Sequence, residues 1–203
     1  MVEAMRDASL MERTALKEWA VLVDAMARGE IIAMIRKGGI REQRAGFSVK
    51  HDRFLFYPTF FHEKANELAP RFVGQLDAAH ARQPEQRDAG LIRLEYVADV
   101  LGVWPVNELE VLRAIDQEHG LDWSAVESRF HYKNKPGVQV VAVRVSRLAA
   151  PAVVPEVRRY RGCVSWVELE DDVDVSNAEP VLDDASLMMR VARLRGVLPI
   201  SSS

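Results

Sequence analysis

Two long strand-like stretches constrain the fold of this chain more than any other feature. Residues 91–104 (LIRLEYVADVLGVW) and 138–148 (VQVVAVRVSRL) are rich in β-branched and apolar residues, which favour strands. Gly102 interrupts the first stretch and predicts a bulge or bend. Helix-like segments lie before, between and after them, so strand and helix do not alternate as in a doubly wound parallel fold. We therefore expect a single-domain α+β fold with a mixed or antiparallel curved sheet, or a small β-barrel, flanked by helices.

Shorter segments complete the predicted order of elements. Apolar side chains at three-and-four spacing predict a helix over 14–28, capped by Thr14 and ended by Gly29. Pro58 is expected to end the strand before it. The other predictions are strands over 31–35, 54–57 and 163–169, helices over 105–119, 123–128 and 180–198, and an acidic loop over 171–177. One domain over 13–198 holds them all, with a flexible N-terminus over 1–12 and a tail over 199–203.

Composition restricts the cellular compartments and the classes of partner that we expect for this chain. The single cysteine, Cys163, excludes an intrachain disulfide, and the N-terminus does not resemble a signal peptide. No apolar run approaches the roughly 20 residues of a membrane span, so we expect a cytoplasmic protein with no membrane partner. The net charge of −3 is unsuited to general polyanion binding, but cations predominate over 28–64 and 129–161, while acids collect in 168–174 and 179–184. We therefore expect a local basic face that binds RNA, DNA or nucleotide phosphate. The alternative is a solvated surface of mixed charge.

The motif RKGGI follows the predicted strand over 31–35. Gly38 and Gly39 can adopt positive φ and bring backbone amides close to an anion. Arg36 adds a bidentate guanidinium and Lys37 a point charge, so these four residues form a candidate phosphate site. Side-chain alternation places Arg36 and Lys37 on opposite faces of the strand. The alternative is a Gly-Gly hairpin with cations on its surface.

A second motif, YPTFFHE, ends an aromatic-rich segment. If Thr59 begins a helix, then Thr59, His62 and Glu63 converge at the end of the strand. His62 is then a candidate general base or phosphate ligand, with Glu63 or Glu95 orienting it. The alternative is structural, with Thr59 as a cap and the neighbouring phenylalanines in the core.

A third motif, RFHYKNKPG, interleaves cations with aromatic rings. Arg129, His131, Lys133 and Lys135 could neutralise phosphates while the rings between them stack on a base. A basic loop before a strand is the alternative. The chain has no P-loop, no G-x-G-x-x-G and no H-E-x-x-H, and we predict neither a cofactor nor a metal site.

Several uncommon blocks occur in a recognisable order. ALKEWA (15–20), RKGGI (36–40), YPTFFHE (57–63), RVSRL (144–148) and GC-x-SW (162–166) together resemble an uncharacterised prokaryotic family with a domain of unknown function. The resemblance spans nearly the whole chain and implies no activity.

A second resemblance is confined to residues 16–37, which are similar to the opening of ASCH and other PUA-like domains. It implies a small β-barrel that binds RNA, nucleotides or modified bases in a cleft beside a helix. Trp19 would line that helix, Gly29 would make the turn and Arg36 would face the cleft. Ile31 stands where family members often have a lysine, and Met34 replaces the usual glutamate, which argues against transferring a catalytic role.

Three functions fit these features. The first is a nucleic-acid- or nucleotide-binding module that uses the basic Gly-Gly corner and an adjacent His/aromatic cleft. The second is a hydrolase or nuclease with His62 as general base. The third is a non-enzymatic interaction protein in which the motifs only shape turns.

Overall fold

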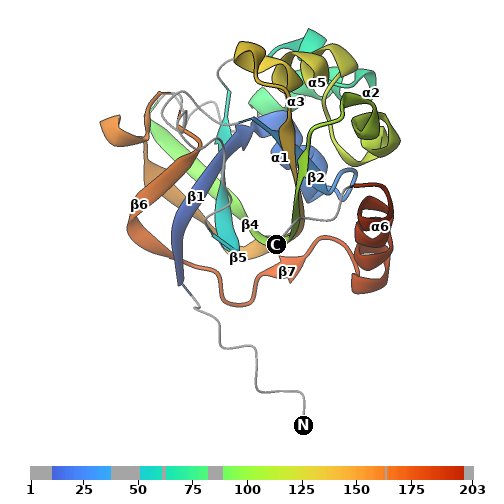
Figure 1. Cartoon of the computed structure of the whole chain (residues 1–203). Coiled ribbons are helices and arrows are strands. Elements are labelled where there is room, and N and C mark those ends of the chain that lie inside the picture. The colour runs from blue at the N-terminus through green and yellow to red at the C-terminus, as the bar shows by residue number, and fades with distance from the viewer. Residues whose placement is uncertain (1–10, 38–50, 61–62, 82–88, 163, 199–203) are drawn as a thin grey trace.

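The two longest strands, β4 (Leu91–Val106) and β5 (Val138–Pro155), pair along most of their length and form the centre of a curved sheet (Figure 1). The computed structural model describes residues 11–37, 51–60, 63–81, 89–162 and 164–198. The other strands are β1 (Met11–Trp19), β2 (Ala33–Arg36), β3 (Arg53–Thr59), β6 (Trp166–Asp174) and β7 (Glu179–Pro180). The helices are α1 (Ala20–Ala27), α2 (Pro70–Val73), α3 (Leu76–Ala81), α5 (Trp123–Phe130) and α6 (Asp184–Val197). Four 3₁₀ segments complete the described elements: η2 (Ala65–Glu67), η3 (Leu109–Glu118), η4 (Tyr132–Asn134) and η5 (Arg158–Tyr160).

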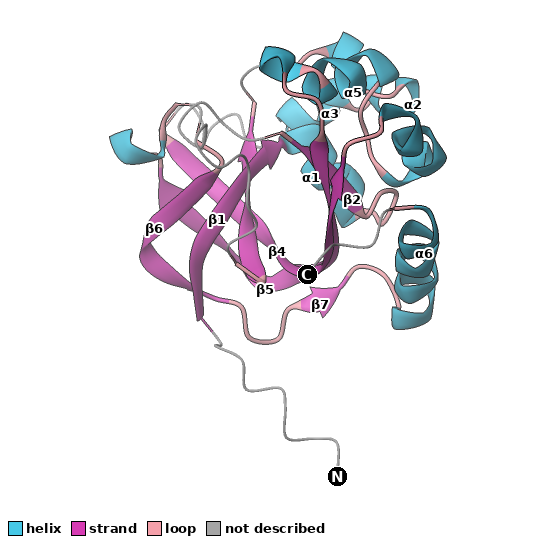
Figure 2. Ribbon diagram, viewed as in Figure 1, coloured by secondary structure: helices cyan, strands magenta, loops and turns pink. Residues whose placement is uncertain are grey.

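The sheet is mixed, as the element order predicted. Its strands run in the order β2-β5-β4-β3-β1-β6, and β7 adds to β5. The β1–β3 pair is parallel and the other pairs are antiparallel. The β4–β5 register shifts at Leu94/Tyr96 and at Val100/Gly102, so the bulge or bend predicted at Gly102 is confirmed as a bulge-like irregularity. The described strands form an open path from β2 to β6, which curves strongly without closing (Figure 2).

Each face of the curved sheet has its own core. The larger core joins the helices to one face and includes the aromatic side chains of Phe54 and Phe56. The smaller one packs Tyr57 against Tyr160 on the other face. Figure 1 shows α1, α2, α3 and α5 gathered at one end of the sheet. The site described below lies at that end.

The helix predicted over 14–28 begins only at Ala20, because Met11–Trp19 is strand β1. Along β1 the buried side chains alternate between the two cores, with Ala15 in the smaller core and Leu16 in the larger. Burial on both faces hides the two-residue period of a strand and leaves a pattern that also fits a helix. Pairing with β3 and β6 decides the conformation.

Three further boundaries differ from the sequence prediction. Pro58 lies inside β3, opposite Glu18 of β1, instead of ending the strand. Residues expected to form a helix over 105–119 instead extend β4 to Val106 and then form η3, which is kinked at Ile115. The predicted acidic loop is strand as far as Asp174.

The turn after α1 is set by Gly29, as expected. Gly29 has φ +70, in the left-handed region, and a Cβ built there would lie 2.6 Å from the Leu182 side chain. This turn directs the chain into β2 and therefore fixes where Arg36 emerges. No helix in the part of the chain that the structure describes combines the length and apolar character needed to cross a bilayer.

Candidate functional site

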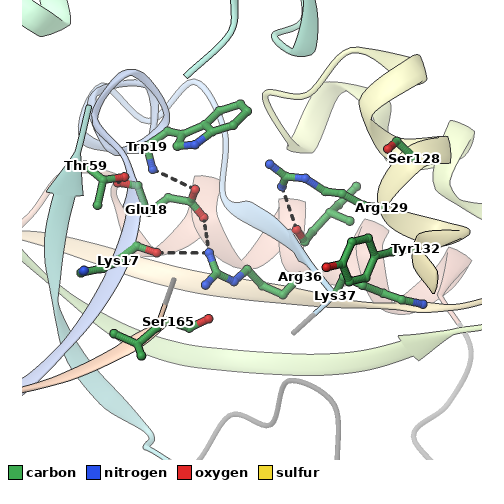
Figure 3. Close-up of a pocket in the computed structure, with 12 residues that line it drawn as sticks. Lys17, Glu18, Trp19, Arg36, Lys37, Thr59, Ser128, Arg129, Tyr132 and Ser165 are labelled. Atoms are coloured by element: carbon green, nitrogen blue, oxygen red, sulfur yellow. Dashed lines mark hydrogen bonds and ion pairs between the residues drawn. The ribbon is translucent and has the colours of Figure 1, made fainter. Parts of the chain in front are cut away.

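Three strands end around one cavity. Trp19, Arg36 and Thr59 are the last residues of β1, β2 and β3, and Trp19 lies directly opposite Thr59 in the parallel β1–β3 pair. Helix α5 and the loop after it form the opposite wall (Figure 3). The cavity has a volume of about 380 Å³, within the range of small-molecule sites. Its described lining consists of Lys17, Glu18, Trp19, Ile35, Arg36, Lys37, Thr59, Ser128, Arg129, Tyr132, Val164 and Ser165.

A buried ion pair joins two of these strands. Arg36 Nη1 donates to Glu18 Oε2 at 3.0 Å and to the Lys17 carbonyl oxygen at 3.2 Å. Glu18 Oε1 accepts from the Trp19 backbone N–H at 2.9 Å, and its side chain is only 4% exposed. These contacts hold the Arg36 guanidinium at the end of β2 against β1. Arg36 therefore lines the cavity, and its role as a ligand stays a prediction.

Arg129 supplies a second guanidinium on the α5 side. Its Nη1 donates to the Ile35 carbonyl oxygen at 3.1 Å, and its Cζ lies 5.1 Å from the centre of the Trp19 ring. Burial lowers the pKa of Arg129, although a guanidinium keeps its proton at any ordinary pH. Trp19 and Arg129 thus present an aromatic face and a cation side by side.

Lys37 points away from Arg36, as strand alternation predicts (Figure 3). Its Nζ donates to the carbonyl oxygens of Phe130, Lys135 and Gly137. An ammonium group has three donors, and these carbonyls account for all of them. Burial, and then the charge of Lys135, lower the pKa of Lys37. Lys37 therefore fastens the loop after α5 to the end of β2.

That loop carries Tyr132 on the rim of the cavity. The residue is 42% exposed, and Lys133 Nζ lies 5.4 Å from the centre of its ring. Lys133 and Asn134 both have positive φ, at 55 and 56, which is uncommon for residues other than glycine. Strained backbone of this kind persists where surrounding contacts hold it, and the Lys37 contacts do so here.

The remaining predicted phosphate-site residues fall into three groups. Thr59 lines the cavity and donates from Oγ1 to the Glu18 carbonyl oxygen at 3.2 Å, whereas His131 and Lys135 are exposed outside the described lining. Gly38, Gly39 and His62 lie outside the described residues, so their roles stay predictions.

The two candidate carboxylates lie elsewhere. The Glu63 side chain is fully buried, where it accepts from the Val21 N–H at the start of α1 and pairs with His80. Burial raises the pKa of Glu63. Glu95 pairs with Arg93 at 3.1 Å beside a separate small hollow. Neither belongs to the cavity lining, and the described residues include no cluster of metal-ligating side chains.

Sequence reasoning missed several residues of the site. The sequence motifs do not identify Glu18, Ser128, Tyr132 or Ser165 as ligands, although the Tyr132 ring belongs to the motif RFHYKNKPG. The strand assignment of 11–19 would have pointed to Glu18, because it places a charged residue inward next to Leu16.

Comparison with known proteins gives a family but no activity. No curated protein matches the chain. Two solved structures from Zymomonas mobilis resemble it, a mutant of ZmASCH and ASCH. The first has a TM-score of 0.46 and 10% identity, covering 79% of this chain and 89% of that one. The second has a TM-score of 0.43 and 11% identity, covering 92% and 95%.

At these TM-scores and identities, neither structure assigns a ligand or a residue role to this chain. The family comparison is more direct, since it matches residues 15–193 and so includes all five blocks noted in the sequence. The chain belongs to the family described as "Domain of unknown function (DUF1802)".

Proposed function

We propose that the cavity binds one nucleotide unit, either free or within a single strand of RNA or DNA. The observation that carries this is the meeting of two guanidinium groups and two aromatic rings, Arg36, Arg129, Trp19 and Tyr132, around about 380 Å³. Aromatic rings stack on bases of any sequence, and guanidinium groups bind phosphate bidentately. The resemblance of residues 16–37 implies the same class of ligand.

The charge of the cavity fits a nucleotide better than a neutral ligand. Its described lining has four cationic residues, Lys17, Arg36, Lys37 and Arg129, against one carboxylate, Glu18. Lys17 is not an expected phosphate contact, because its ammonium donates to the carbonyl oxygens of Tyr160 and Gly162. Since Lys37 is held by three carbonyls, the two guanidinium groups are the expected phosphate contacts.

Fluorescence polarisation tests the proposal. Labelled short RNA and DNA strands are titrated with the protein at several salt concentrations, and nucleoside monophosphates compete for the site. Two phosphate contacts predict that log K falls against log salt with a slope of about −1.4, from about 0.7 per contact on a single strand. A much steeper slope would indicate binding along the outer surface instead.

Variants locate the binding. Arg129→Gln and Tyr132→Leu are expected to weaken it, whereas Arg193→Gln, an exposed change on α6 away from the cavity, serves as the matched control. The proposal fails if no strand or nucleotide binds, or if all three variants bind as the unaltered protein does.

A further inference from the structure

A second, much smaller hollow lies behind the wall of the cavity. Glu18, Ile35 and Arg129 line both spaces. His119 also lines the hollow. The other lining residues are apolar or glycine: Leu22, Met26, Ile31, Ala33, Met34, Gly120 and Leu121. The hollow has a volume of about 10 Å³, roughly the space that one water molecule requires.

His119 brings an unsatisfied donor to this hollow. The residue is 1% exposed, and its Nδ1 accepts a hydrogen bond from the Leu121 backbone N–H at 3.2 Å. In a neutral imidazole the proton must then be on Nε2. Burial lowers the pKa of His119 to about 4, so the ring is neutral at pH 7. Nε2 has no hydrogen-bond partner among the described residues.

A buried donor of this kind calls for an acceptor, and the hollow contains a suitable one. Among its described lining residues, Glu18 is the only one with a carboxylate. A carboxylate has about four lone-pair positions, and the described contacts of Glu18 are with the Trp19 N–H and the Arg36 guanidinium. An apolar hollow would stay dry, but one between a donor and a carboxylate offers water the two partners it needs.

We infer that one water molecule occupies this hollow and connects His119 to Glu18. The water accepts from His119 Nε2–H and donates to the Glu18 carboxylate. His119 is then a positioning residue, which holds Glu18 from behind while Glu18 holds Arg36 in the cavity. Only the consequence for ligand binding rests on the proposed nucleotide function.

The water is tested first on the unaltered protein, without ligand. Ring ¹⁵N shifts report the tautomer of each histidine, and cross-relaxation with solvent detects a long-lived water beside an N–H. The expected result is an Nε2–H tautomer for His119 and a cross-peak from that proton to water. An Nδ1–H tautomer, or an Nε2–H without a water cross-peak, would overturn the inference whether or not any nucleotide binds.

Two variants then distinguish a positioning role of His119 from a role in packing alone. His119→Asn places an amide near Nδ1, so the Leu121 contact can persist while the donor at Nε2 is lost. His119→Gln places an amide donor near Nε2 and is expected to restore the water. Nucleoside monophosphate affinity should fall about fivefold in the Asn variant, as for one hydrogen bond, and recover in the Gln variant. Equal affinities in both variants would refute the positioning role, while a failure of the unaltered protein to bind would count against the proposed function alone.

Discussion

Removing Arg36 alone from the Glu18–Arg36 ion pair should destabilise the protein more than removing both members. Their side chains are 4% and 13% exposed, and the Arg36 Nη1 to Glu18 Oε2 distance is 3.0 Å. Arg36→Met would leave a buried carboxylate without its cation, and Glu18→Gln would leave a guanidinium facing a neutral amide. In the double variant neither charge is left alone, so we expect part of the loss to be recovered.

The size of the effect follows from this burial. Loss of one partner from a buried pair costs 3–5 kcal/mol in general. The partial exposure of Arg36 places Arg36→Met near about 3 kcal/mol, and the amide left by Glu18→Gln reduces that change to about 2 kcal/mol. If the double variant loses only about 2 kcal/mol, the coupling energy is about 3 kcal/mol. For a domain of this size, Arg36→Met should lower Tm by roughly 6–12 °C.

Urea unfolding of the four proteins measures the coupling. The control cycle is Lys64→Met with Glu67→Gln, a pair at 2.9 Å whose lysine is 60% exposed, and its coupling should stay below about 0.5 kcal/mol. A Glu18–Arg36 coupling no larger than this control would refute the reasoning that the pair is desolvated. Nucleotide binding distinguishes stability from function, because the double variant should regain stability but not affinity.

The remaining predictions concern the rim, the turn and the response to pH. Tyr132→Leu should weaken nucleotide binding by about 1–3 kcal/mol, measured by titration calorimetry, with little change in Tm because the ring is exposed. Gly29→Ala should lower the free energy of unfolding by about 1–3 kcal/mol in urea, because of its positive φ and the nearby Leu182 side chain. As pH falls from 6.5 towards 4, the unfolded chain protonates His119 but the folded chain does not. Stability should therefore fall by about 3 kcal/mol, and His119→Gln should flatten this part of the pH profile. The raised pKa of Glu63 has the opposite sign, so Glu63→Gln should remove a loss of stability that sets in as pH rises above 4.5.

The long central strands could be predicted because their own residues favour a strand, without reference to the neighbouring strands. β4 and β5 are β-branched and apolar over most of their length, and Gly102 marks the bend where their register shifts. β1 could not, because it is buried on both faces and runs directly into α1 without a turn. Its partners, β3 and β6, lie far along the sequence, and their pairing is not visible in the residues of β1 itself.

The same error explains what was missed in the site. A helix over 14–28 would make Glu18 an ordinary surface residue, so nothing marked it as the partner of Arg36. Arg36 and Arg129 could be identified from cationic motifs, but their meeting depends on β2 ending beside α5. Composition indicates that cations are available, and only the tertiary structure determines which acceptors they reach.

Those acceptors are largely backbone carbonyls, and this has a consequence for recognition. Where strands end without a neighbour, carbonyl oxygens need donors. The Lys37 ammonium donates to three carbonyl oxygens, and the Lys17 ammonium donates to two others. A guanidinium has five N–H donors, and the described hydrogen bond of Arg129 uses Nη1 alone. An arginine can thus donate to a strand-end carbonyl and to a phosphate at the same time. A lysine in the same place has too few donors, in too compact a group, to do both. Arg129→Lys should therefore keep the charge of the cavity yet lose affinity nearly as fully as Arg129→Gln, a result that a purely electrostatic site would not give.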